Sequence, residues 1–396
     1  MKQILSILVF FICNICVSAQ TRLITVENPY NKPVERHPVI VKITDADVKS
    51  ATVTYQGKMI SSQLDDLDCD GIYDELFFQT DLKRGEKKSF EVEYHHTKKP
   101  SNEPSQVYVE MMLTNSKVKS TNKQDLYISH LTVEKGVNPY WMLHHHGVAF
   151  ENDMVAYRIY FDHRQTIDIY GKYHRGLELK ATQFYPDDEQ KTAGYGDDVL
   201  WVGSTLGLGT LRGWDGTKPV MLENVEHRSQ RIIARGPLRT IVEVRDEGWT
   251  PCTGVQPVNM TQRFTLMAGH RECRVDVSID GPTEGLLLST GIINVKNSVE
   301  YTDHKGLRGC WGTDWPVSAK DSVGHKRETV GLGIYVQHEQ IQSEESANKD
   351  NYAFVLKASP RFTYYVTFCS DNEDFGFHSA EEWFAYLKKW EKSIHP

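Results

Sequence analysis

The chain has 396 residues, which is too long for one ordinary hydrophobic core and predicts two domains or one unusually large β domain. Hydrophobic residues make up 39% and aromatic residues 11%, which excludes a disordered chain. The formal charge is −8, and this excludes nucleic-acid binding through a general positive field. We therefore expect a globular protein without a nucleic-acid partner.

Residues 1–19 have the pattern of a secretory signal peptide. Lys2 supplies the positive start, Ile4 to Ile12 form the apolar stretch, and Val17-Ser18-Ala19 places small residues before a cleavage point. This stretch is too short to span a bilayer, and no later run approaches the ~20 residues required. Asn14 and Ile15 make a poor lipidation box before Cys16. We expect a periplasmic or secreted protein, a lipid anchor being the less favoured alternative.

The seven cysteines do not form a recognisable framework. Two lie in the signal peptide, and the remaining five are odd in number and widely spaced: Cys69, Cys252, Cys273, Cys310 and Cys369. The sequence therefore predicts neither a disulfide scaffold nor a structural zinc site.

Residues 20–97 alternate short apolar runs with turn residues, as in Pro38–Ile43 and Ser89–Tyr94. This spacing predicts a small immunoglobulin-like β-sandwich. Residues 98–105 are polar with two prolines and are the best candidate for a linker.

Residues 106–396 continue the β pattern almost to the end. Ser379 and Glu382 suit a helix N-terminus, and Trp383, Leu387 and Trp390 then recur with helical spacing, predicting a helix over 379–393. The fold class is thus mainly β, with a small N-terminal β-sandwich, a large β-sandwich domain and one C-terminal helix.

An acidic loop in the small domain carries a metal-binding pattern. Asp66, Asp68, Asp70 and Asp74 surround Gly71 in the way that short loops wrap oxygen ligands around Ca²⁺. The alternative is a solvated turn, in which the aspartates and glycine serve only the bend. A structural Ca²⁺ is the one cofactor that the sequence suggests.

Candidate site residues concentrate between residues 140 and 201. Trp141 stands beside three consecutive histidines, of which His145 and His146 suit proton transfer, and at least one of the three is expected to serve only packing or surface hydrogen bonds.

Two strands joined at 163–165 follow these histidines. Strand alternation places Arg158, Tyr160 and Asp162 on one face of the first, and Asp168, Tyr170 and Lys172 on one face of the second. A hairpin would combine them either in a ligand-facing surface, which the tyrosines favour, or in a solvent-exposed face with cross-strand ion pairs.

Glycine-rich segments add further candidates. Tyr195, Asp197, Asp198 and Trp201 lie in a loop that suits a cleft, whereas the dinucleotide-like glycines after it lack the strand–helix context of a nucleotide site. His227 is a loop candidate, and Trp311 in a second glycine-rich segment suits either a sugar-stacking lip or a packed corner.

Segments such as 260–266 and 273–277 make the large domain resemble the galactose-mutarotase-like supersandwich. The acidic loop 66–76, the hairpin 156–172 and the loop 196–209 make the whole mature chain similar to the domain-of-unknown-function 4861 family of exported bacterial proteins. Members of that family accompany polysaccharide-degrading enzymes, so the resemblance implies a carbohydrate partner. It carries over no catalytic residues.

These observations lead to two hypotheses. The first is an exported carbohydrate-active enzyme, either a lyase or a glycoside hydrolase, acting on uronic-acid-containing plant or algal oligosaccharides. In the lyase version Arg158 or Lys172 neutralises the uronate and a tyrosine or histidine moves the proton, and in the hydrolase version two aspartates do the acid–base work. The second is a glycan-binding protein without catalysis. The sequence does not indicate an oligomeric state.

Overall fold

The computed structural model describes residues 20–99, 103–118, 124–251 and 254–394, so the predicted signal peptide, part of the predicted linker and Cys252 lie outside the described residues. The chain is mainly β, as predicted. In the described part of the chain, no helix combines the length and the apolar character needed to cross a membrane.

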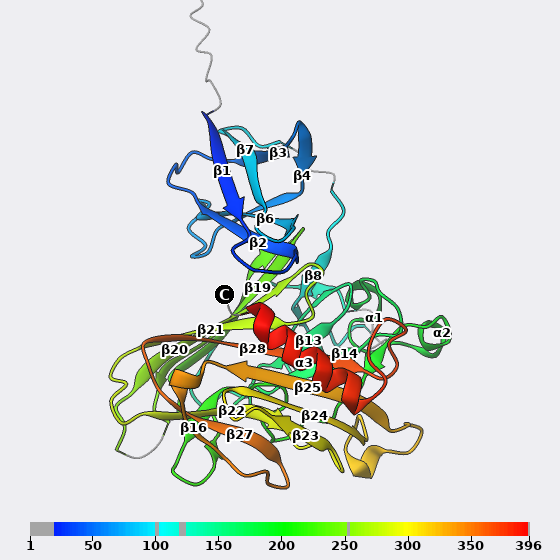
Figure 1. Cartoon of the computed structure of the whole chain (residues 1–396). Coiled ribbons are helices and arrows are strands. Elements are labelled where there is room, and N and C mark those ends of the chain that lie inside the picture. The colour runs from blue at the N-terminus through cyan, green and yellow to red at the C-terminus, as the bar shows by residue number, and fades with distance from the viewer. Residues whose placement is uncertain (1–19, 100–102, 119–123, 252–253, 395–396) are drawn as a thin grey trace, which may run out of the picture.

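The N-terminal unit consists of two antiparallel sheets that enclose a small core, in which Phe78 and Phe90 pack together. Figure 1 shows strands β1 to β7 gathered in this unit, set apart from the rest of the chain. In sheet order, the strands are β1 (Gln20–Glu27), β7 (Lys87–His95), β3 (Ser50–Tyr55) and β4 (Lys58–Ile60), and then β2 (Val34–Lys42), β6 (Glu75–Leu82) and β5 (Ser62–Asp65).

The large domain is built on a nine-stranded antiparallel sheet whose strands alternate buried and less buried residues. In sheet order, its strands are β11 (His130–Glu134), β18 (His227–Arg235), β19 (Arg239–Trp249), β20 (Val258–Met267), β21 (Cys273–Asp280), β28 (Arg361–Ser370), β25 (Glu328–Val336), β24 (Leu307–Asp314) and β23 (Val299–Thr302).

Two five-stranded sheets pack against one face of this sheet, because one continuous hydrophobic core contains residues from all three. The first contains β15 (Asp197–Asp198), β14 (Ile167–Gly171), β13 (Ala156–Tyr160), β12 (Gly147–Asn152) and β8 (Val107–Glu110). The second contains β17 (Pro219–Val220), β16 (Arg212–Trp214), β22 (Leu287–Ile293), β27 (Asn351–Lys357) and β26 (Ile341–Glu344). The result is a large β-sandwich.

Short elements complete the domain. The strands β9 (Met112–Leu113) and β10 (Leu126–Tyr127) form a small ribbon, and the short helices are α1 (Leu179–Thr182), α2 (Asp188–Thr192) and the 3-10 turns η1 (His144–His146), η2 (Ala319–Asp321) and η3 (His338–Gln340).

The C-terminal helix α3 (Ala380–Ile394) confirms the predicted helix to within one residue at each end. The Ser379 hydroxyl accepts a hydrogen bond from the Glu382 amide at 3.2 Å, as an N-cap should. Trp383, Leu387 and Trp390 are buried against the outer face of the nine-stranded sheet, where α3 lies across β25 in Figure 1. Glycine makes this approach possible, since a Cβ on Gly333 would lie 2.5 Å from Leu387 Cδ2.

Candidate functional site

The predicted hairpin forms as strands β13 and β14, with Arg158 directly opposite Asp168. Successive side chains of a strand point to opposite faces of the sheet. Tyr157, Ile159 and Ile169 therefore lie in the sandwich core, and Arg158 and Asp168 lie on the other face. This polar face is neither open to solvent nor a broad ligand surface, which differs from both readings of the sequence. Residues 172–196, here called the covering segment, lie over it and seal it with the apolar side chains of Leu179 and Phe184.

The centre of this face is the Arg158 cluster, which consists of Arg158, Tyr160, Asp168, Tyr185 and Asp198. Arg158 Nη2 donates to Asp168 Oδ2 at 2.5 Å, to Asp198 Oδ2 at 3.0 Å and to the Tyr160 hydroxyl at 3.0 Å. Its Nη1 donates to the Tyr185 hydroxyl at 3.0 Å. One guanidinium therefore fixes two carboxyl groups and two phenols in one place.

Only part of this cluster can meet a substrate. The Asp168 side chain is 1% exposed, whereas the Asp198 side chain is 21% exposed. Asp168 also accepts a hydrogen bond from the Tyr160 hydroxyl at 3.0 Å, so it fixes Arg158 and Tyr160 relative to each other on the buried side of the cluster. Asp198 is the carboxyl group of the cluster that is both bound to Arg158 and partly exposed to solvent.

Burial, followed by the neighbouring Asp168 carboxylate, raises the pKa of Asp198 well above its ordinary value. The positive charge of Arg158 lowers the pKa of Asp198, but Arg158 is shared between the carboxyl groups of Asp168 and Asp198. Burial also raises the pKa of Tyr160 and of Tyr170, so both phenols keep their protons. The arrangement supplies a proton donor at Asp198 and removes the tyrosines as candidate bases.

A hollow of about 270 Å³ borders Asp198. Asp197, Tyr195 and Lys191 line it from the covering segment and β15, and Lys326 lines it from the loop before β25. Asp197 is bound by Lys191 at 2.6 Å. The predicted residues Tyr195, Asp197 and Asp198 thus lie together.

Gly196 fixes the place of the two aspartates that follow it. Its amide donates to Glu178 Oε2 at 2.9 Å, and its carbonyl accepts from the Tyr170 hydroxyl at 2.7 Å. A Cβ on Gly196 would lie 1.9 Å from the Gly171 carbonyl oxygen, so only glycine permits this approach. Tyr170, predicted to be catalytic, is fully buried and acts as a support for β15.

Lys172 was also predicted to be catalytic, and its position contradicts that role. Its ammonium is fully buried, donates to Glu151 Oε2 at 2.5 Å and to the Asn152 carbonyl at 2.7 Å, and also donates to the Gly176 carbonyl. Glu151 accepts in addition from the Leu179 amide at 2.8 Å. The pair clamps the covering segment onto the sheet and cannot touch a substrate.

The three histidines point in different directions because His145 and His146 have left-handed backbone angles, with φ of 42° and 67°. His145 Nε2 lies 3.2 Å from Glu110 Oε1, and both side chains are fully buried. Burial lowers the pKa of His145 to about 3 and raises the pKa of Glu110 to about 8, so both are neutral near pH 7. His145 is therefore a core residue, which corrects its predicted catalytic role.

His146 is only half-buried and stacks on the Tyr140 ring, with centroids 3.8 Å apart. Its Nδ1–H donates to the Tyr140 carbonyl at 2.9 Å, which leaves Nε2 as the acceptor nitrogen. Burial lowers its pKa to about 4, so the ring is neutral. Arg164, bound to Asp162 at 2.5 Å, lies between the Tyr140 and Tyr160 rings. Asp162 thus belongs to the neighbouring Arg164 pair rather than to the Arg158 cluster.

The predicted aromatic residues separate into two groups. Trp141 is 74% exposed and stands edge-on to His146, and Trp201 is 48% exposed three residues after Asp198. Trp311, by contrast, packs beside α3 on the outer face of the nine-stranded sheet, so the packed-corner reading is the right one. His227 lies on that same outer face, on the opposite side of the sandwich from Asp198, which contradicts its predicted place in the site.

The acidic loop brings carboxylate oxygens of Asp66, Asp68 and Asp74 within 4.8 Å of one another, whereas Asp70 stands outside this group. Asp66 accepts from the Cys69 amide at 2.7 Å and from the Gly71 amide at 2.8 Å, which is also how a plain turn is held. Calcium binding at the loop stays a prediction.

Sequence reasoning missed Tyr185 and Glu110. Tyr185 belongs to the covering segment, which has no apolar periodicity that could place it over Arg158. Glu110 lies in β8, two strands away from Arg158. Alternation along β8 put Glu110 on a definite face, but nothing in the sequence identified β12 as its neighbour.

The profile of the family described as "Domain of unknown function (DUF4861)" matches residues 26–396. A comparison with curated proteins gave no match. Among solved structures, a glycosyl hydrolase family 38 protein from Enterococcus faecalis is similar at 12% identity, with a TM-score of 0.46, over 96% of this chain and 47% of its own. An alpha-mannosidase from Enterococcus faecalis V583 is similar at 12% identity, with a TM-score of 0.47, over 95% and 45%. The chain spans about half the length of these structures.

Proposed function

The chain belongs to the DUF4861 family, and from the geometry of its site we propose that it is an exported carbohydrate-active enzyme that cleaves glycosidic bonds in uronic-acid-containing oligosaccharides. The observation that carries the proposal is Asp198, a partly exposed carboxyl whose pKa is raised and which borders a hollow. Hydrolysis and β-elimination both need an acid that protonates the departing glycosidic oxygen. Asp198 would fill that role.

The other groups have supporting parts. Arg158 orients Asp198, and Asp168 and Tyr160 hold Arg158 in place. Arg158 is therefore a positioning residue and not the group that neutralises a uronate, because its side chain is 2% exposed and both of its Nη groups already donate within the cluster. Lys191 and Lys326 line the hollow and are well exposed, so their ammonium groups can take a uronate carboxylate.

Two groups are available as the proton acceptor. His146 is neutral and has no recorded hydrogen-bond partner at Nε2 among the described residues. Asp197 is adjacent to Asp198 and is exposed to the hollow. A histidine base suits elimination and a second carboxylate suits hydrolysis, so the reaction type distinguishes them.

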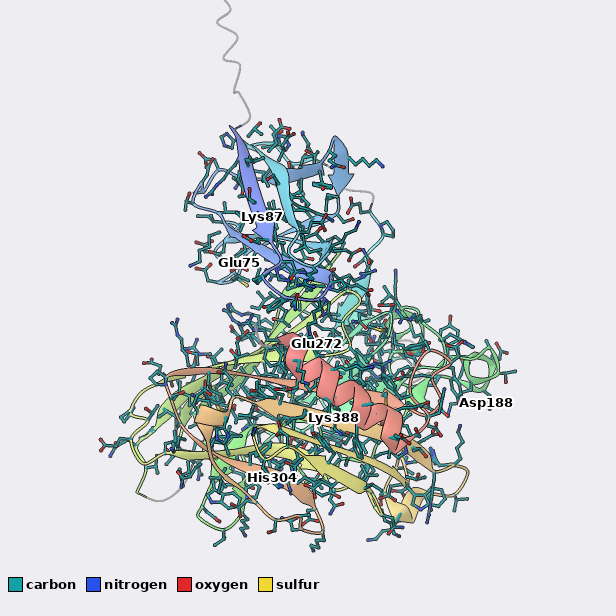
Figure 2. The ribbon with its side chains drawn as sticks, in the orientation of Figure 1. Glu75, Lys87, Asp188, Glu272, His304 and Lys388 are labelled. Carbon is teal, nitrogen blue, oxygen red and sulfur yellow. The ribbon has the colours of Figure 1, made fainter. Side chains whose placement is uncertain are left out.

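The experiment is a screen of uronic-acid polysaccharides with two readouts. New absorbance near the ultraviolet edge reports the conjugated double bond of elimination, and new reducing ends without it report hydrolysis. Asp198→Asn should abolish whichever activity appears, and His146→Gln should do so only for elimination. Asp188→Asn serves as the matched control, because Asp188 lies on α2 at the outer edge of the domain (Figure 2).

A glycan-binding protein without catalysis is the second candidate, and the exposure of Trp141 and Trp201 favours it. It predicts binding by calorimetry without turnover on any substrate of the screen. Trp141→Ala would then weaken binding, and Asp198→Asn would leave it unchanged.

A further inference from the structure

A second cleft lies at the junction of the N-terminal unit and the large domain. It has a volume of about 380 Å³ and is lined by Arg36, Tyr55, Gln79 and Lys88 from the N-terminal unit and by Gln106 and Leu238 from the other side. Ligand pockets commonly measure about 300–1,000 Å³ and often occur between domains. The cleft falls within that range, whereas the hollow beside Asp198 is slightly below it.

The junction itself is held by polar contacts next to this cleft. Arg239 binds Asp65 at 2.7 Å and Glu75 at 2.9 Å, and Gln63 accepts from the Leu238 amide at 2.8 Å. Figure 2 shows Glu75 on the part of the N-terminal unit that faces the large domain. The two walls of the cleft are therefore fixed relative to each other before any ligand arrives.

Arg36 is set into the cleft by its backbone. Its φ is 48°, and its amide donates to Asp81 Oδ1 at 2.7 Å. Its side chain passes over Gly269, where a Cβ would lie 2.3 Å from Arg36 Cδ. Its Nη1 then donates to Gln106 Oε1 at 2.9 Å, across the junction. The guanidinium is thus held at a defined place between the two units.

The charge of Arg36 is left without a carboxylate partner among the described residues. The arginines Arg231, Arg239 and Arg263 at the same junction each pair with a carboxylate, but Arg36 has only the neutral amide of Gln106. Lys88 lines the same cleft; its shortest contact is to the Asp81 carbonyl, and the Glu86 carboxylate lies 4.0 Å from its Nζ. Arg36 and Lys88 therefore bring two cations with unused donors to this space, against the single acid, Asp81, that also lines it.

Tyr55 adds an aromatic platform beside these cations. Its ring packs on Phe90 with centroids 5.2 Å apart, and Lys88 Nζ lies 5.3 Å from its centroid. Tyr55 is partly exposed and Phe90 is buried behind it. A ring backed in this way can stack on the apolar face of a sugar while the cation next to it binds a charged substituent.

We propose that this junction cleft is a second binding site, separate from Asp198, for an acidic sugar residue. The uronate carboxylate pairs with Arg36, with Lys88 adding a second donor, and the sugar face lies on Tyr55. Gln79 and Gln106 supply hydrogen bonds to hydroxyl groups. The choice of ligand rests on the proposed function, whereas the site itself rests on the cleft. A chain that fills it contacts both units at once.

The test is a calorimetric titration of the full chain carrying Asp198→Asn, which stops turnover, with tetragalacturonate. Two binding events are expected. Adding Arg36→Gln or Tyr55→Ala should weaken one of them by about tenfold or more, because a charge-assisted contact or the stacking surface is lost. Lys305→Ala, in the turn between β23 and β24 of the large domain, removes an exposed cation that lines neither the cleft nor the hollow, and it should change neither event. Neutral cellotetraose should not bind at the cleft.

The outcomes separate the two proposals. If the site at Asp198 binds no uronate, a single event remains and Arg36→Gln weakens it by the same factor. An isotherm that neither Arg36→Gln nor Tyr55→Ala changes, with circular dichroism showing folded variants, overturns the second site. Equal binding of cellotetraose at the cleft also overturns it, because the cations would then have no role.

Discussion

Replacing Lys172 by Met separates a structural role from a catalytic one. The ammonium of Lys172 is fully buried and forms an ion pair with Glu151 beneath the covering segment. Methionine keeps most of the volume of the stem but removes the charge and the three donors. We expect the variant to lose stability rather than chemistry.

The size of the loss follows from the groups left behind. Removing one partner of a buried ion pair costs about 3–5 kcal/mol, because the other charge stays buried. The carbonyls of Asn152 and Gly176 also lose their donor. The loss of stability is reduced because Glu151 still accepts hydrogen bonds from the amides of Glu178 and Leu179. The free energy of unfolding should therefore fall by about 4 kcal/mol near neutral pH.

Urea unfolding followed by circular dichroism measures this change, and activity per folded molecule is measured in parallel. A second variant, Lys172→Met with Glu151→Gln, should recover part of the loss, because the unpaired charge is then absent. The reasoning is refuted if Lys172→Met costs less than about 1 kcal/mol, the range of an exposed ion pair. It is equally refuted if activity per folded molecule disappears while the unfolding midpoint is unchanged.

Three further predictions concern other parts of the molecule. Gly196→Ala should destabilise the protein by about 1–3 kcal/mol and lower activity, because the new Cβ meets a backbone oxygen at 1.9 Å, whereas Gly176→Ala, with no atom within 4 Å, should do neither. The His145 ring, whose pKa burial lowers to about 3, should show no NMR titration above pH 5, and a midpoint near 6.5 would contradict its burial. Its contribution to stability is complete above about pH 6.5, where the unfolded imidazole is neutral, and is lost as the pH falls toward 3. For the acidic loop, millimolar Ca²⁺ should raise the melting temperature of the metal-stripped protein and Asp74→Asn should cancel the rise, while no shift in the wild type removes the calcium prediction.

Local sequence patterns predicted those parts of the fold that depend on neighbours along the chain. The period-two alternation of the hairpin placed Arg158 and Asp168 on one face, and the pairing of β13 with β14 confirms it. The helical spacing from Trp383 to Trp390 predicted α3. The joining of two five-stranded sheets to the nine-stranded sheet could not be predicted, because strands far apart in the sequence pair there.

For the candidate site, strand alternation predicts which side chains share a face of the sheet and nothing more. Whether a polar face stays open depends on what covers it, and the covering segment has no periodicity from which its path could be inferred. For that reason Lys172 and Tyr170 were expected to face a ligand and are instead buried. The same limit applies to Trp311, whose loop-like glycines belong to a strand that supports α3.

The measurement that tests the central claim most directly compares Asp198→Asn with Asp188→Asn on the uronic-acid substrate that the screen identifies. The claim predicts that Asp198→Asn stays folded and loses turnover by at least about a hundredfold, the usual share of a general acid. It also predicts that the wild-type rate falls on the alkaline side as Asp198 loses its proton, since burial raises its pKa. An Asp198→Asn variant that turns over at the wild-type rate would contradict the account.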